Sequence, residues 1–202
     1  TDILVRAAGK NLPDVFSYWA GGRVQFIVDS NSLLPIDDMW ERDGLDMVVA
    51  KSVANSATMY NGKRYLVPLN YHYSGMFYNK SVLSKAGINT MPSTWDEFLS
   101  LCAKLKSKGI TPIALGSKNR WPAQFWFDYL ILRTVGPDYR HNLMTGKAAY
   151  DDYAVKHAMS IWKDLVDKGY FTNNSNADTW TDASDKVARG KAAMTLMGTW
   201  IT

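Results

Sequence analysis

The sequence predicts an α/β protein in which helices alternate with short, buried strands. Apolar residues recur at helical spacing through the second half of the chain, and short apolar runs such as 111–115 lie between those helices. The chain has 202 residues, enough to bury a core in one large domain or two small ones. Hydrophobic residues make up 47% of it and charged residues 21%, which excludes an intrinsically disordered chain.

The first 70 residues are expected to form short elements. Residues 13–19 (PDVFSYW) are apolar and aromatic, as is typical of a short buried strand. Asn61-Gly62 accepts positive φ at both central positions of a tight turn, so it favours a β-hairpin with a return strand over 65–69. Further expected elements are a helix through Val24, Ile27 and Val28, a helix capped by the pair Asp37 and Asp38, a helical stretch at Leu45–Val49 and a strand at Met76–Tyr78.

From about residue 80 the pattern predicts longer helices. Thr94 and Glu97 have the spacing of a capping box, and Gly109 has the position of a helix stop. The change of pattern near 70–80 predicts a lobe boundary, with residues 1–72 in a first lobe, a crossing near 70–76 and residues 73–202 in a second, more helical lobe. The other expected elements are strands over 111–115 and 192–197, a buried helix from Pro122 through Leu132, and a helix with an apolar stripe from Val155 to Val166 that Gly169 closes.

Several function classes lack their signals in this sequence. It has no glycine-rich phosphate loop, no nucleotide fingerprint and no nucleophile elbow. The net charge of +4 is spread along the chain, so a nucleic-acid partner is not expected. Cys102 is the single cysteine and the three histidines lie far apart, so no disulfide, metal site or cofactor is predicted.

Paired carboxylates are the one catalytic alternative that the sequence leaves open, because two of them suffice for a glycoside hydrolase. Most candidates stand where helix caps are expected, which favours a capping role over catalysis. They are Asp37, Asp38, Asp128, Asp178 and Asp182.

The eight tryptophans fall into two groups. Trp40, Trp95, Trp126 and Trp162 are expected in the core, the last three because of their places on apolar helices. The remaining four are expected at loop junctions: Trp19 and Trp200 after strands, Trp121 and Trp180 before helices. Ligands of open α/β sheets bind at the carboxyl ends of strands. Rigid aromatic faces beside a few polar groups suit a sugar ring, which is apolar on its faces and hydroxylated at its edges.

Ordered segments along nearly the whole chain carry a family resemblance. They are PDVFSYW (13–19), LLPIDD (33–38), YNGKRYLVPLN (60–70), GMFYNKSVLSKAGI (75–88), PSTWDEFLSLCAKLKSKGITPIALG (92–116), RWPAQFWF (120–127) and GKAAMTLMGTW (190–200). In this order the chain resembles the sugar-binding extracellular solute-binding proteins of ABC importers, the family that includes the maltose-binding proteins.

The resemblance implies a type II periplasmic-binding-protein-like fold with two α/β lobes. A sugar or oligosaccharide would be held in the inter-lobe cleft without turnover, by an extracytoplasmic protein (periplasmic or a cell-surface lipoprotein), and delivered to the transmembrane subunits of an ABC permease. Family members are considerably longer, so both lobes are expected to be incomplete in an internal fragment. Such a fragment is expected to self-associate through apolar faces at Val15, Phe16, Met194 and Leu196.

Site residues follow from the same resemblance. A stacking aromatic falls on Tyr18 or Trp19, and the inter-lobe contact falls near 70–73, where maltose binders use a carboxylate and this chain has His72, which indicates a different sugar. The residues expected at the ligand site are Tyr18, Trp19, Asn70, Tyr71, His72, Tyr73, Arg120, Trp121, Trp180 and Trp200. A carbohydrate-active hydrolase and a lectin-like sugar sensor remain the alternative functions.

Overall fold

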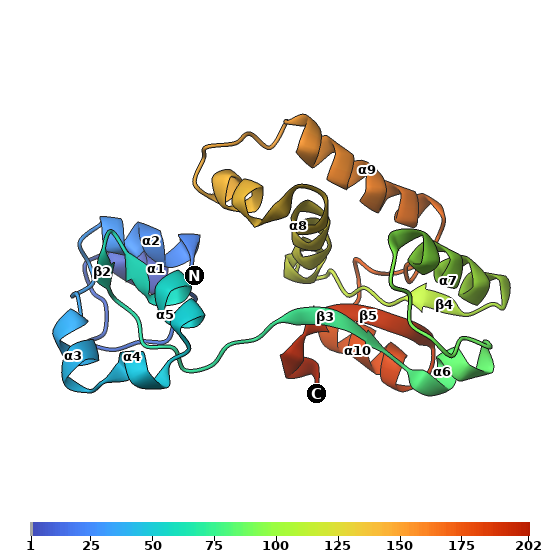
Figure 1. Ribbon diagram of the computed structural model, residues 1–202, viewed down its shortest axis with the longest axis horizontal. Coiled ribbons are helices and arrows are strands. Elements are labelled where there is room, and N and C mark those ends of the chain that lie inside the picture. Colours follow the sequence, from blue (N-terminus) through green and yellow to red (C-terminus); the bar gives the residue numbers. More distant parts are fainter. Residues whose placement is uncertain (1) are drawn as a thin grey trace. The chain divides into compact units, whose positions relative to one another are not determined.

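The computed structural model describes residues 2–202, and the chain divides into two compact units, Thr1–Tyr71 and His72–Thr202 (Figure 1). Unit 1 is mostly helical and contains one hairpin. Its elements are α1 (Asp2–Ala8), α2 (Gly22–Asp29), α3 (Asp37–Arg42), α4 (Leu45–Val48), α5 (Lys51–Thr58), β1 (Met59–Tyr60) and β2 (Lys63–Arg64).

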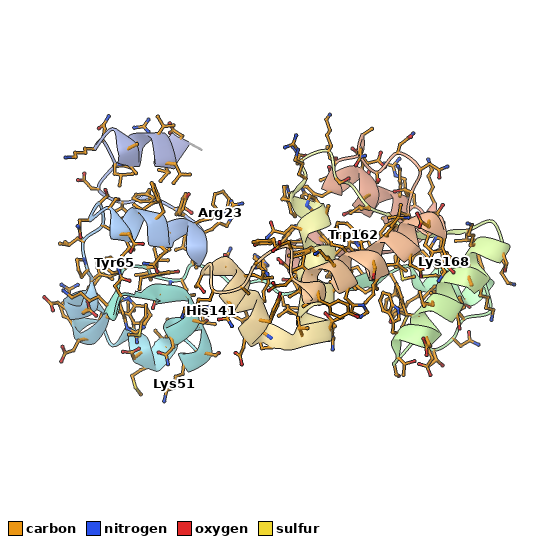
Figure 2. The ribbon with its side chains drawn as sticks, turned by 90° about the horizontal axis from the view of Figure 1, so that it is seen from above. Arg23, Lys51, Tyr65, His141, Trp162 and Lys168 are labelled. Atoms are coloured by element: carbon orange, nitrogen blue, oxygen red, sulfur yellow. The ribbon has the colours of Figure 1, made fainter. Side chains whose placement is uncertain are left out.

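The Asn61-Gly62 turn of unit 1 is confirmed. Strands β1 and β2 pair antiparallel, and the two turn residues have φ of 50° and 77°, as a two-residue hairpin turn requires. The return strand ends at Arg64, however, so the prediction of a strand over 65–69 is wrong. Side chains from that segment pack instead against the unit's small core of Val24, Val28 and Tyr60, and Figure 2 labels one of them, Tyr65.

Residues 13–19 form no strand, which corrects the prediction. They have no partner in either sheet of the described chain, and Val15 is 89% exposed. Their aromatic rings pack against one another edge to face, with centroids 6.3 Å apart for Phe16 and Tyr18 and 5.5 Å apart for Tyr18 and Trp19. An apolar run of this length does not distinguish a strand from such a loop.

The capping role expected for Asp37 and Asp38 is also wrong. Helix α3 begins at Asp37 itself, after an N-cap at Ile36 that makes no side-chain capping bond. Both carboxylates lie in the first turn, where they favourably oppose the helix dipole. Asp37 Oδ1 accepts a hydrogen bond from the Arg64 amide at 3.1 Å, which joins α3 to the hairpin.

Unit 2 contains a three-stranded sheet in the order β3 (Ser74–Tyr78), β5 (Ala192–Gly198), β4 (Thr111–Ile113). The central strand β5 runs antiparallel to β3 and parallel to β4, and all seven of its residues are buried. Helices α8 and α10 lie on opposite sides of this sheet (Figure 1). The helices of the unit are α6 (Lys80–Lys85), α7 (Trp95–Ser107), α8 (Trp121–Met144), α9 (Tyr153–Asp167), α10 (Trp180–Ala188) and the short 3₁₀ helix η1 (Thr199–Ile201).

Helix α7 confirms both predicted end signals. Thr94 Oγ1 accepts from the Glu97 amide, and Glu97 Oε2 accepts from the Thr94 amide, each at 3.2 Å. Gly109 follows the helix with φ of 72°. Trp95 is 41% exposed, so its assignment to the core is wrong: it opens the helix at the edge of the buried stripe, with its ring centroid 5.2 Å from that of Phe98.

Helix α8 extends beyond the predicted end at Leu132. It kinks at Gly136, which has φ of 87°, and continues after Pro137, whose missing amide N–H breaks the helical ladder. Arg140 Nε donates to Asp128 Oδ1 at 2.6 Å and so links the two halves. Trp126 is buried, as predicted. The predicted burial does not extend all round the helix, because Leu132 is 41% exposed.

The main core of unit 2 surrounds β5. Met194 and Leu196 are buried by β3, β4 and the covering helices, so the expectation that these two side chains lack neighbours is wrong. Trp162, labelled in Figure 2, packs against both this core and the smaller cluster between α8 and α9, and it is half-buried. The predicted self-association of the fragment stays a prediction.

Candidate functional site

Three of the four tryptophans predicted at loop junctions come together in unit 2. The ring centroid of Trp121 lies 6.4 Å from that of Trp180 and 6.0 Å from that of Trp200, with interplanar angles of 54° and 57°. Phe125 lies 5.5 Å from Trp121 and 6.0 Å from Trp200. We refer to Trp121, Phe125, Trp180 and Trp200 as the aromatic cluster.

Two loops bring these aromatics together. Trp121 opens α8, Trp180 opens α10, and Trp200 follows β5 in η1. The loops before α8 and α10 are bound to each other, since the Ser117 amide donates to Ser175 O at 2.7 Å and the Lys118 amide donates to Asp178 O at 2.9 Å.

Gly116 permits this contact between the loops. A Cβ at this position would lie 1.9 Å from the carbonyl oxygen of Thr179. Only glycine allows the two backbones to approach so closely. The starts of α8 and α10 therefore lie side by side, and their first residues share one cluster.

Polar groups border the aromatic cluster on the side of His72. Its imidazole lies 5.3 Å from the Trp200 ring at an interplanar angle of 85°, and its Nδ1 is 2.9 Å from Thr199 Oγ1. The Thr199 amide donates to Tyr73 O at 3.0 Å. The start of unit 2 is thus bound to the segment that carries Trp200.

Arg120 adds a cationic group beside Trp121. It has φ of 64° and ψ of −40°, a strained backbone conformation that is rare for a residue with a side chain. Arg120 lines a cavity of about 530 Å³ together with Ser117, Asn176 and the apolar side chains of Trp162 and Phe171. Among residues 2–202 it forms no ion pair.

The remaining predicted site residues lie apart from these contacts. Tyr18 and Trp19 belong to unit 1, where the Arg23 guanidinium lies 5.2 Å from the Trp19 ring centroid; Arg23 is labelled in Figure 2. Trp19 is 63% exposed, but the prediction that it follows a strand is wrong. Tyr71 ends unit 1, and both it and Tyr73 are exposed, as is Asn70. Their assignment to a ligand site stays a prediction.

The carboxylates considered for catalysis hold the fold instead. Asp128 pairs with Arg140 and Asp178 with Lys186, and Asp182 forms a capping box with Thr179. Hydrogen bonds from the Thr179 hydroxyl and amide hold the pKa of Asp182 below its usual value. None of these three is a free carboxylate poised for proton transfer.

No group of three or more His, Cys, Asp or Glu side chains within residues 2–202 is placed to hold a metal ion. Over the same residues, no helix has the length and apolar character needed to cross a membrane.

Phe125 is the member of the aromatic cluster that sequence reasoning missed. It lies four residues after Trp121 on α8, and residues at that spacing share one helix face. The four-residue spacing from Trp121 was the feature of the sequence that could have predicted Phe125 as a member of the cluster. Gly116 gave no local signal, because its role depends on a segment about 60 residues away in sequence.

Known proteins are similar to this chain along nearly its whole length. The family described as bacterial extracellular solute-binding protein matches residues 1–202. An uncharacterized ABC transporter extracellular-binding protein of Pyrococcus horikoshii is 34% identical over 96% of this chain and 43% of its own length. A probable sugar-binding periplasmic protein of Brucella melitensis is 30% identical over 99% of this chain and 47% of its own.

A solved chitin oligosaccharide binding protein has the same fold, with a TM-score of 0.90 and 31% identity over 99% of this chain and 49% of that one. The chain thus spans about half the length of the proteins it matches. The predicted type II periplasmic-binding-protein-like fold is confirmed, with both lobes incomplete in these 202 residues.

Proposed function

The chain belongs to the bacterial extracellular solute-binding proteins, and from this premise we propose that it is part of the carbohydrate-binding component of an ABC import system. The protein would capture a sugar or oligosaccharide outside the cytoplasm, release it unchanged and deliver it to the transmembrane subunits of a permease. Residues 1–72 would contribute to one lobe, with a crossing near 70–76, and residues 73–202 to a second. The aromatic cluster carries this proposal.

The cluster offers the chemistry that a sugar needs. An indole face packs against the C–H face of a pyranose ring and loses little conformational entropy on binding, because its side chain has only two rotatable bonds. Trp121 and Trp200 provide two such rings, whose centroids lie 6.0 Å apart at an interplanar angle of 57°. Burying most of one side chain's apolar area in this way contributes about 1–3 kcal/mol of binding free energy.

Hydroxyl groups at the sugar edge need polar partners once water is displaced. We assign this role to His72, whose ring centroid lies 5.3 Å from that of Trp200, and to Arg120, which directly precedes Trp121 in the sequence. An arginine donates several hydrogen bonds in a fixed plane and holds adjacent hydroxyls in one orientation. Asn70 and Tyr73 would add contacts from the inter-lobe segment.

The proposal is tested by a thermal-shift screen of the full-length protein against monosaccharides and oligosaccharides. A ligand that binds only the native state at one hundred times its Kd stabilises it by about 2.7 kcal/mol. We expect at least one carbohydrate to raise Tm in a concentration-dependent way, and chromatography of the mixture to recover that carbohydrate unchanged. Cleavage products would contradict a binding role. A shift with amino acids or peptides and with no carbohydrate would contradict the ligand class.

A further inference from the structure

The indole of Trp200 lies directly against the backbone of Gly198. A Cβ at Gly198 would lie 2.1 Å from Trp200 Cζ3, 2.2 Å from Cη2 and 2.5 Å from Cε3. These separations are far below the contact distance of two carbon atoms, about 3.5–4.0 Å. A hydrogen atom fits between backbone and ring at this position, and a methyl group does not.

The backbone of Gly198 does not itself require glycine. Its φ of −81° and ψ of 161° are ordinary extended values that any residue adopts. The residue ends strand β5, where it pairs with Ser74. Because glycine weakens a strand relative to alanine, its presence here needs another reason, and the ring of Trp200 supplies one.

Other contacts border the same ring. The ring centroids of Phe125 and Trp121 each lie 6.0 Å from that of Trp200, and the His72 ring lies 5.3 Å away in a T-shaped arrangement. Trp200 is nevertheless 37% exposed, so solvent still reaches part of its side chain. The ring therefore has an open direction in which to swing if its contact with Gly198 is lost.

We propose that Gly198 is a positioning residue for carbohydrate binding: it admits the Trp200 indole flat against the end of β5 and so sets the ring's place in the aromatic cluster. The inference rests on the proposed function, because the ligand that meets this ring is taken to be a sugar. Gly198 itself offers no side chain to the ligand. Its effect passes entirely through Trp200.

Gly198→Ala tests the proposal in the full-length protein, with Gly75→Ala as the matched control. Gly75 lies in the neighbouring strand β3 opposite Met197, and a Cβ there meets nothing within 4 Å. Gly198→Ala should change the near-ultraviolet circular dichroism of the coupled indoles and weaken binding of the carbohydrate found by the thermal-shift screen roughly tenfold or more. Gly75→Ala should leave both unchanged.

Combining Gly198→Ala with Trp200→Ala separates positioning from a general packing defect. With no ring at position 200, the added methyl group has nothing to displace, so adding Gly198→Ala to Trp200→Ala should change neither affinity nor Tm further. If Gly198→Ala alone unfolds the protein, the double variant still tests the proposal. A Tm far below that of the Trp200 single variant would overturn it. An unchanged indole spectrum in Gly198→Ala would also overturn it. If the wild-type protein binds no carbohydrate while Gly198→Ala still changes the indole spectrum, the positioning of Trp200 by Gly198 stands and the proposed function is contradicted.

Discussion

Arg64 is expected to hold unit 1 together, and Arg64→Met should lower the free energy of unfolding of that unit by about 2–3 kcal/mol. The Arg64 side chain is 12% exposed, and its guanidinium donates to Ala54 O at 3.0 Å and to Thr58 Oγ1 at 2.9 Å. It also lies 4.2 Å from the ring centroid of Trp40, which is fully buried.

The magnitude follows from these contacts. Each of the two hydrogen bonds from this charged donor is worth at least about 1.5 kcal/mol, and the contact with the indole about 1 kcal/mol, so their simple sum is about 4 kcal/mol. Two facts reduce the expected loss to about 2–3 kcal/mol. Thr58 still donates to Ala54 O in the variant, and the ion pair with Asp46, which is 60% exposed, contributes little.

Urea denaturation of the full-length protein, followed by tryptophan fluorescence, measures the change in the free energy of unfolding. The transition of interest is the one to which Trp40 of unit 1 contributes. Arg42→Met is the matched control, because Arg42 is 71% exposed and its ion pair is with its sequence neighbour Asp43. We expect it to stay within about 0.5 kcal/mol of the wild type. Equal stabilities for the two variants would refute the reasoning.

Three further predictions follow from single contacts. Gly116→Ala should lower stability by about 1–3 kcal/mol and weaken carbohydrate binding as well, because a methyl group would separate it from Thr179; a wild-type urea midpoint would contradict this. Backbone hydrogen bonds from Ser93 and Thr94 lower the pKa of Glu97, so its stabilising effect is complete above the unfolded pKa and is lost as pH falls through the folded one. Urea midpoints of wild type and Glu97→Gln should therefore differ at about pH 7 and converge toward about pH 3, and a constant difference would contradict the capping role. Burial raises the pKa of the Cys102 thiol to about 12, so iodoacetamide at about pH 8 should leave it unmodified in the native protein and alkylate it in urea, whereas rapid native alkylation would be inconsistent with its burial.

Local signals predicted much of this fold because their causes lie within a few residues. The turn at Asn61-Gly62, the capping box of Thr94 and Glu97 and the helix stop at Gly109 all depend on backbone preferences of adjacent positions. The strand at 192–197 was predicted because it is apolar except at Thr195, as is typical of a strand buried on both faces.

Features that depend on distant residues were missed or misassigned. Residues 13–19 have the composition of a buried strand but no strand to pair with, and α5 was not expected from its polar, alanine-containing sequence. Trp95 has the right spacing for the core yet lies at the edge of the buried stripe. Positions at strand ends and helix starts were enough to select Trp121, Trp180 and Trp200, whereas their contact depends on Gly116, which only the packing of two loops reveals.

The ratio of carbohydrate dissociation constants between Trp200→Ala and the wild type tests the central claim most directly. Calorimetric titration of both full-length proteins with the sugar identified by thermal shift measures it. Loss of one stacked indole should raise Kd by about ten- to a hundredfold, which corresponds to roughly 1–3 kcal/mol, while Tm without sugar stays close to that of the wild type. An unchanged Kd in a folded Trp200→Ala variant would contradict the assignment of the aromatic cluster as the carbohydrate site.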